Sequence, residues 1–265
     1  MKIKLELEDK IVGRPIRCNK QILVPKKGKD YAEVVFLGDV HYGSPQCDVK
    51  KFLEQINYCL KHKIYVFLMG DLLEMATRTS IGAGIYEQEE IGQSQFETMV
   101  KYLMPLAEKN LILGSHNGNH EDRVYQATGI DIAKAMAREL GVPYLGNACW
   151  NEFRVKNQVY SIYSLHGRTG SRYDGTALTA LERLSASFSC DLVAMGHAHR
   201  CINSSIIYQK VSNGVIKEVK KYLLITGHYL KYDGSYAQTT GLSLSKIGSP
   251  KIKFFSDHKN IHISW

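Results

Sequence analysis

The chain has 265 residues, 44% of them hydrophobic, which is enough for one large domain with an extensive buried core. It has neither an export-type apolar stretch near its start nor a run of eighteen apolar residues. This argues against secreted and membrane-spanning classes, so we expect a cytoplasmic protein with no membrane partner. The six cysteines form no C-x-x-C pair and are expected to be reduced, buried thiols.

Charge is distributed unevenly along the chain. Residues 1–30 contain nine Lys or Arg against four acids, residues 31–199 contain 15 against 19, and residues 200–265 contain ten against three. Basic ends around an acidic centre suit a polyanionic partner such as nucleic acid. A basic chain whose charge serves solubility alone is an equally good interpretation.

Strands and helices are predicted to alternate in the first half of the chain. Glu33 to Leu37 and Ile64 to Met69 are short β-rich runs, and Asp48 to His62 between them has apolar residues at helical spacing. A strand, a helix and a second strand predict a parallel crossover, which brings the carboxyl ends of both strands to one edge of a sheet. Further predicted elements are a helix at Gln93 to Lys109, a strand at Leu111 to Leu113 that leads into a loop at Gly114 to Glu121, and a helix at Asp131 to Leu140.

The second half is predicted to be richer in antiparallel strands, with one helix at Thr176 to Phe188 and a hairpin turn at Asn213-Gly214. We expect a single domain over 1–265, made of a basic N-terminal strand or extension (1–30), a core (31–200) and a strand-rich C-terminal part (201–265). The predicted strands are Trp150 to Val155, Val159 to Leu165, Leu192 to Met195, Ser205 to Val211, Val215 to Thr226, Lys251 to Phe255 and Ile261 to Trp265.

Five short islands place Asp, Asn or His beside glycine at the ends of predicted strands. Any single island is more often a plain turn, but the joint occurrence at matching positions indicates a site. Together they offer seven carboxylate, amide and imidazole ligands, enough for two divalent cations side by side, and we interpret them as a centre that hydrolyses phosphate esters. The islands are Gly38-Asp39-Val40-His41, Gly70-Asp71, Gly118-Asn119-His120-Glu121, His166-Gly167 and Gly196-His197-Ala198-His199.

These islands, in this order over residues 38–199, resemble the calcineurin-like metallophosphoesterase superfamily. The resemblance implies an α/β (α+β) fold: a four-layer αββα sandwich of two mixed β-sheets flanked by helices, with a dimetal site at the strand carboxyl ends. It also implies the metal ligands: Asp39, His41 and His199 for one ion, Asn119, His166 and His197 for the other, and Asp71 as the bridge.

The same resemblance assigns His120 a catalytic role without metal binding. Two cations would lower the pKa of a shared water, while His120 would hydrogen-bond the phosphate oxygens or protonate the departing alkoxide. Glu74 lies three residues after Asp71, where an acid in related phosphatases orients the catalytic His. The alternative for Glu74 is a surface residue that begins a helix.

Three arginines are expected to bind substrate phosphate. Arg123 could bind a nonbridging oxygen with both arms of its guanidinium, although pairing with Glu121 or Asp122 on the surface is an alternative. Arg168 and Arg172 lie in the loop after His166 and could bind neighbouring phosphates, with a solvated loop as the alternative.

The substrate class is indicated by a looser resemblance. Thr77 to Gly82, Tyr86 to Gln88 and Gly118 to Arg123 are similar to metallophosphoesterases of phages and prophages, which would place the protein in the cytoplasm of a host cell. With the basic ends, this favours a phosphodiesterase or nuclease acting on DNA or RNA. Alternatives are a phosphomonoesterase on nucleotides or phosphoproteins, and a non-catalytic scaffold. The ligand types suit Mn²⁺ first, with Fe or Zn²⁺ as alternatives; the oligomeric state stays open.

Overall fold

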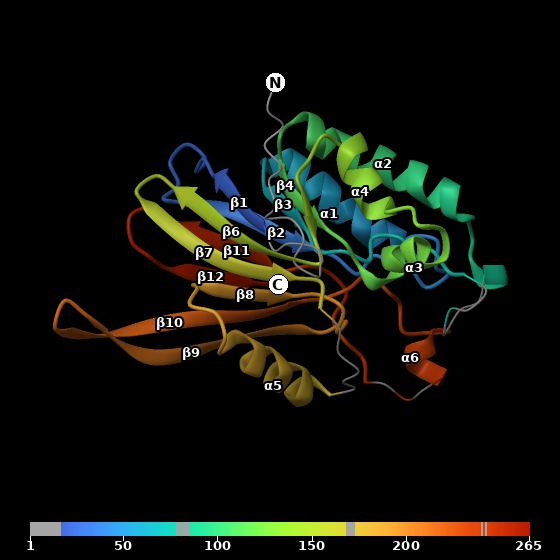
Figure 1. Ribbon diagram of the computed structural model, residues 1–265. Helices are drawn as coiled ribbons and strands as arrows, with labels where there is room; N and C mark the ends of the chain where they lie inside the picture. Colours follow the sequence, from blue (N-terminus) through green and yellow to red (C-terminus); the bar gives the residue numbers. More distant parts are fainter. Residues whose placement is uncertain (1–16, 78–79, 81–84, 168–172, 240, 242) are drawn as a thin grey trace, which may run out of the picture.

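The computed structural model describes residues 17–77, 80, 85–167, 173–239, 241 and 243–265. Within these residues the strands form two six-stranded sheets that pack face to face (Figure 1). Their bounds are β1 (Arg17–Ile22), β2 (Tyr31–Leu37), β3 (Tyr65–Leu68), β4 (Ile112–His116), β5 (Tyr144–Gly146), β6 (Ala148–Val155), β7 (Gln158–Leu165), β8 (Leu192–Met195), β9 (Cys201–Ser212), β10 (Val215–Thr226), β11 (Lys251–Phe255) and β12 (Ile261–Ser264).

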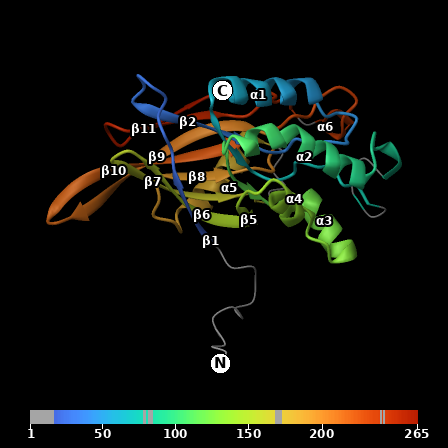
Figure 2. The same cartoon turned by 90° about the horizontal axis from the view of Figure 1, so that it is seen from above.

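Both sheets are mixed. One has the order β12-β11-β2-β3-β4-β5, in which β2 to β5 run parallel, while β11 pairs antiparallel with both β2 and β12. The other has the order β1-β6-β7-β8-β10-β9, with β8 parallel to both of its neighbours. The β9–β10 hairpin extends beyond the rest of the sandwich (Figure 2).

Helices cover the outer faces of the two sheets. In Figure 1, α1, α2 and α4 lie over the β2–β5 sheet and α5 lies over the other sheet. Three apolar clusters fill the spaces between these layers, one below the first group of helices, one between the sheets and one below α5. The expected four-layer αββα sandwich is confirmed. The helices are α1 (Val49–His62), the 3₁₀ turn η2 (Ile85–Glu87), α2 (Gly92–Glu108), α3 (Asn119–Thr128), α4 (Ile132–Glu139), α5 (Asp174–Ser185) and α6 (Tyr236–Thr239).

Helix α1 shows why the sequence pattern predicts this region well. Phe52, Ile56 and Cys59 recur at helical spacing, and all three are buried against the sheet. Asp48 caps the amino end by accepting a hydrogen bond from the backbone N–H of Lys51 at 3.0 Å. The helix therefore forms the expected crossover between the parallel strands β2 and β3.

Several expectations need correction. The segment from Gly118 onward is a helix, α3, so Asn119 and His120 occupy its first turn instead of a loop. The short strand β5 was not predicted either. All six cysteines are free, but Cys18 is exposed and Cys201 is only partly buried. Among the described residues no helix is both long and apolar enough to cross a membrane.

Candidate metal centre

The seven ligand-type side chains all follow strand ends. Asp39 and His41 come after β2, and Asp71 comes after β3. His166 follows β7, whereas Asn119 is the first residue of α3, which comes after β4. His197 and His199 follow β8. Each sheet therefore contributes part of the set.

One group consists of Asp39, His41 and His199, whose ligand atoms all lie within 4.8 Å of one another. The Nε2 atoms of His41 and His199 are 3.0 Å apart, and His199 Nε2 is 3.3 Å from Asp39 Oδ1. Two imidazole nitrogens at this distance are satisfied either by sharing one proton or by directing both lone pairs at one cation. A cation also offsets the charge of the buried Asp39 carboxylate.

Asp71, His166 and His197 form the second group; a further set of such atoms, on His41, Glu74 and His120, shares His41 with the first group. His166 Nε2 lies 3.0 Å from Asn119 Oδ1 and 3.2 Å from Asp71 Oδ2, and the same Asp71 oxygen is 3.9 Å from His41 Nε2. Asp71 thus stands between the two groups. Its Oδ2 and the Nδ1 of His197 are buried without a geometrically acceptable hydrogen bond to any described residue. Unsatisfied buried ligand atoms of this kind fit a bound divalent cation.

The electrostatics of the cluster favour added positive charge. Burial opposes ionisation of Asp71, yet His166 and His120 hold the pKa of its carboxyl well below the usual value. Burial likewise opposes protonation of His166, but Asp71 raises its pKa to about 10. Buried carboxylates thus retain protons on neighbouring imidazoles, and divalent cations would compete with those protons for the same nitrogens.

Backbone strain coincides with the ligands. Asp39, His41, Asp71, His197 and His199 all have φ between 47° and 65°, in the left-handed region that non-glycine residues seldom adopt. Each such residue costs on the order of 1–3 kcal/mol at most, and strain of this kind concentrates at functional sites. The surrounding contacts must therefore fix these loops.

One of these contacts is the close approach of Gly118 to Asp71. A Cβ on Gly118 would lie 2.1 Å from both the backbone nitrogen and the Oδ1 of Asp71. Only glycine allows the amino end of α3 to come this near. The contact places the backbone N–H of His120 2.8 Å from Asp71 Oδ1, where it donates a hydrogen bond.

Glu121 is a structural residue of this site that the sequence did not reveal. It is buried, so a surface ion pair between Glu121 and Arg123 is wrong, whereas the alternative pairing of Arg123 with Asp122 stays open. Its carboxylate accepts hydrogen bonds from the backbone N–H groups of Asp71, Leu72 and Leu73, and of Gly118 at the start of α3. Burial and the nearby Asp71 raise the pKa of Glu121 to about 7. The sequence feature that could have indicated this role is the position of Glu121 three residues after Gly118, which is the capping-box position of α3.

His120 lies beside the ligands. Its Nδ1 is 2.8 Å from the backbone carbonyl oxygen of Glu74, to which it donates, so Nε2 is the acceptor nitrogen and lies 3.0 Å from a guanidinium nitrogen of Arg123. Burial lowers the pKa of His120 to about 4, so the imidazole is neutral. Its Nε2 is 3.9 Å from Asp71 Oδ2.

Glu74 is buried and begins no helix, so its surface alternative is wrong. Its Oε2 is 3.2 Å from His41 Nδ1 and 3.5 Å from His120 Nδ1. Although burial would raise the pKa of Glu74, contact with His41 lowers it below its ordinary value. A buried carboxylate of this kind needs such a partner.

Other predicted residues fall outside this cluster. Arg168 and Arg172 lie outside the described residues. His228 is not among the predicted site residues, yet it is buried and its ring stacks on His199 at 5.4 Å between centroids. A lone His with no ligand-type neighbour in the sequence gave no signal of this proximity.

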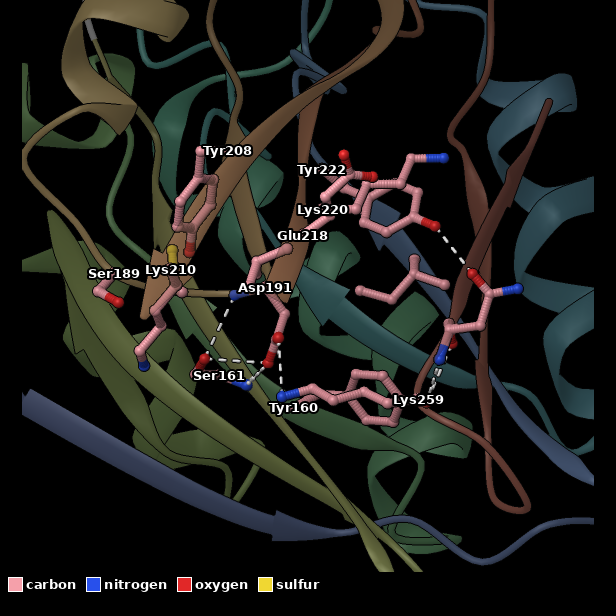
Figure 3. Close-up of a pocket in the computed structure, with 14 residues that line it drawn as sticks. Tyr160, Ser161, Ser189, Asp191, Tyr208, Lys210, Glu218, Lys220, Tyr222 and Lys259 are labelled. Atoms are coloured by element: carbon pink, nitrogen blue, oxygen red, sulfur yellow. Dashed lines mark hydrogen bonds and ion pairs between the residues drawn. The ribbon is translucent and has the colours of Figure 1, made fainter. Parts of the chain in front are cut away.

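A cavity of about 570 Å³ lies elsewhere (Figure 3). Asp191, Tyr208, Lys220 and Lys259 are among the residues that line it, and none of its lining residues belongs to the ligand cluster. Asp191 immediately precedes β8, whereas His197 and His199 follow that strand. The cavity and the ligand cluster thus lie at opposite ends of β8.

Comparisons with known proteins identify no family. No family model matches the chain, and no curated protein matches it. Solved structures that are similar include a conserved Streptococcus pneumoniae protein described as a predicted phosphoesterase, at 12% identity over 88% of both chains and a TM-score of 0.38. A single mutant of Entamoeba histolytica Vps29 matches at 14% identity over 88% of this chain and 97% of that one, with a TM-score of 0.36. The Zn²⁺ complex of wild-type Vps29 gives the same identity and coverage and a TM-score of 0.32. At these values, function has to be derived from the residues of the site.

Proposed function

We propose that this chain is a hydrolase of phosphate esters that uses two divalent cations, and that its substrates are phosphodiesters of DNA or RNA. The observation that carries the proposal is the position of Asp71 between two groups of buried ligands. Two cations held there would supply an activated water and offset the charge on the phosphoryl oxygens. The oxygen and nitrogen donors, with no thiolate in either group, suit Mn²⁺, Fe or Zn²⁺, and we take Mn²⁺ as the proposed ion.

The residues beside the ligands would handle protons and phosphate oxygens. His120 Nδ1 is engaged by the Glu74 carbonyl, so Nε2 is the nitrogen that would face the leaving oxygen. Because the resting imidazole carries its one proton on Nδ1, Nε2 would first take a proton from solvent when the phosphate binds and would then give it to the leaving oxygen. The Arg123 guanidinium, next to that nitrogen, would donate to a nonbridging phosphate oxygen. Both groups lie on α3, which Gly118 and Glu121 hold against the Asp71 loop.

The preference for a polymeric diester is supported by the net charge of +8 and by the excess of Lys and Arg after residue 200. The second candidate is a phosphomonoesterase. It is favoured by the position of Arg123 beside His120, because a guanidinium there could hold the additional charge of a terminal phosphate.

A substrate panel in Mn²⁺ tests the proposal: single- and double-stranded DNA, RNA, bis(p-nitrophenyl) phosphate and p-nitrophenyl phosphate. The wild type should cleave the diester and at least one polymer faster than the monoester. Asp71→Asn should lose metal and activity together, whereas His120→Ala should keep metal and lose about 10²- to 10⁴-fold in turnover. Faster cleavage of the monoester would support the second candidate, and a metal-loaded wild type that cleaves none of the substrates would support a non-catalytic scaffold.

A further inference from the structure

Glu74 lies between two histidines and can serve only one of them well. His41 is a metal-ligand residue in the proposed function, whereas His120 is the proton-handling residue. The carboxylate oxygen Oε2 is closer to His41 Nδ1, at 3.2 Å, than to His120 Nδ1, at 3.5 Å. If the carboxylate positions His41, its loss should weaken metal binding. If it positions His120, its loss should leave metal binding unchanged.

The geometry of His41 requires a partner at Nδ1. Its Nε2 faces His199 Nε2 at 3.0 Å and Asp71 Oδ2 at 3.9 Å, so Nε2 is the nitrogen directed at a cation. A neutral imidazole that binds metal through Nε2 carries its proton on Nδ1. That atom is buried and has no geometrically acceptable hydrogen bond to any described residue. The Glu74 carboxylate lies 3.2 Å from it, where a small rotation of the side chain would let Oε2 accept the Nδ1–H.

His120, by contrast, already has an acceptor. Its Nδ1 donates to the backbone carbonyl oxygen of Glu74 at 2.8 Å, and an imidazole has one Nδ1–H to give. This contact uses the main chain, so it persists when the Glu74 side chain is replaced. The same residue thus orients His120 through its backbone and leaves its carboxylate for His41.

We infer that Glu74 is a positioning residue for His41: its carboxylate accepts the Nδ1–H of His41 and directs Nε2 at the cation held with Asp39 and His199. This inference rests on the proposed dimetal function. A carboxylate behind a metal-bound histidine fixes the tautomer and ring orientation and increases the basicity of the ligand nitrogen. It also restrains a ligand whose backbone φ is 52°, in the left-handed region.

Titration of the metal-free protein with Mn²⁺ by calorimetry, and with Co²⁺ by visible absorption, tests the inference. In Glu74→Ala one of the two binding steps should weaken about 10- to 100-fold and the other should stay unchanged. Glu74→Gln keeps the size and an acceptor oxygen, so it should show the same effect at smaller magnitude. His120→Asn, the matched control, should bind both ions as tightly as the wild type.

Turnover of bis(p-nitrophenyl) phosphate gives a second readout. Saturating Mn²⁺ should restore most of the turnover of Glu74→Ala, because the defect lies in occupancy, and should not restore that of His120→Asn. If Glu74→Ala and Glu74→Gln, both folded by circular dichroism, bind two ions as tightly as the wild type, the inference is overturned. It is also overturned if excess metal leaves their turnover as low as that of His120→Asn.

The two proposals fail in different ways. A wild type that binds no divalent ion removes the proposed function together with this inference. A wild type that binds two ions and cleaves the ester, with Glu74 variants that bind them equally well, removes the inference alone.

Discussion

Glu121 accepts a hydrogen bond from the backbone N–H of Leu72 at 2.7 Å, although 49 positions separate the two residues in the chain. Further backbone N–H groups of the same loop, together with that of Gly118, donate to the same carboxylate. One side chain thus fixes the loop that carries Asp71. The left-handed backbone of Asp71 is held by these hydrogen bonds.

Replacing Glu121 with Ala should destabilise the protein by about 3–5 kcal/mol, because several buried backbone N–H groups lose their acceptor. Glu121→Gln should also destabilise, since its amide NH₂ would face N–H donors. Urea unfolding measures both. Glu108→Gln, an exposed change at the end of α2, is the control and should shift the free energy of unfolding by less than about 0.5 kcal/mol. A Glu121→Ala protein as stable as this control would contradict the role given to the carboxylate.

Gly118→Ala should lower metal affinity as well as stability. The added Cβ would overlap the Asp71 backbone nitrogen and Oδ1, and both are held by other contacts. Gly175→Ala is the matched control: it lies in the first turn of α5, and its Cβ would meet nothing within 4 Å. Urea unfolding and Mn²⁺ calorimetry on both proteins make the comparison. Equal behaviour of the two variants would show that the loop accommodates the extra atom.

Mn²⁺ should stabilise the folded protein by mass action, since the ligand groups are assembled only in the fold. At a free ion concentration of 100 times Kd, one site contributes about 2.7 kcal/mol. Thermal unfolding with Mn²⁺ and with a chelator measures the shift. Asp71→Asn should show a much smaller shift, because the residue between both groups loses its charge. If Asp71→Asn shows the same shift as the wild type, the stabilising ions bind at another place in the protein.

His116 should make stability depend on pH below neutrality. It is buried between the sheets, where its Nδ1 donates to the Gly146 carbonyl and its Nε2 accepts from Ser164. Burial lowers its folded-state pKa to about 4, below the ordinary 6.5. Between pH 4 and 6.5 the unfolded chain therefore binds more protons than the folded one. The stability that the neutral His116 contributes is present above pH 6.5 and is lost as the pH falls toward 4.

At pH 5.5 the loss of stability from His116 amounts to about 1.2 kcal/mol relative to pH 7. Urea unfolding of the wild type and of His116→Asn at several pH values between 7.5 and 5 measures the part of the pH dependence that comes from His116. The variant should be less stable at neutral pH but should lose less on acidification. Parallel pH profiles of the two proteins would show that His116 does not titrate on unfolding.

The sequence predicts the elements that carry a clear apolar pattern. The predicted bounds of β8, β10 and β11 are those of the structure, and α1 differs by one residue at its start. Helix α3 was missed because Glu121 is its one buried residue, so it has no apolar face to give helical periodicity. Strand β5 has three residues, too few for a pattern.

The ligands themselves could be read from the sequence because each sits beside glycine at a strand end. The residues that hold the ligands in place could not be predicted from the sequence, because their roles depend on which distant segments come together in the fold. Glu121 serves a loop about 50 residues earlier, and Glu74 turns its carboxylate toward His41 while its carbonyl meets His120. His228 approaches His199 because β10 lies beside β8.

The ligand groups are divided between the two sheets: Asp39 and His41 follow a strand of one sheet, and His199 follows a strand of the other. Asp39 also accepts the backbone N–H of His197 across this boundary, at 3.0 Å. Asp71 likewise follows a strand of the first sheet, whereas its partners His166 and His197 follow strands of the second, so each group takes ligands from both sheets. During folding, cation uptake would therefore report the moment at which the two sheets come together.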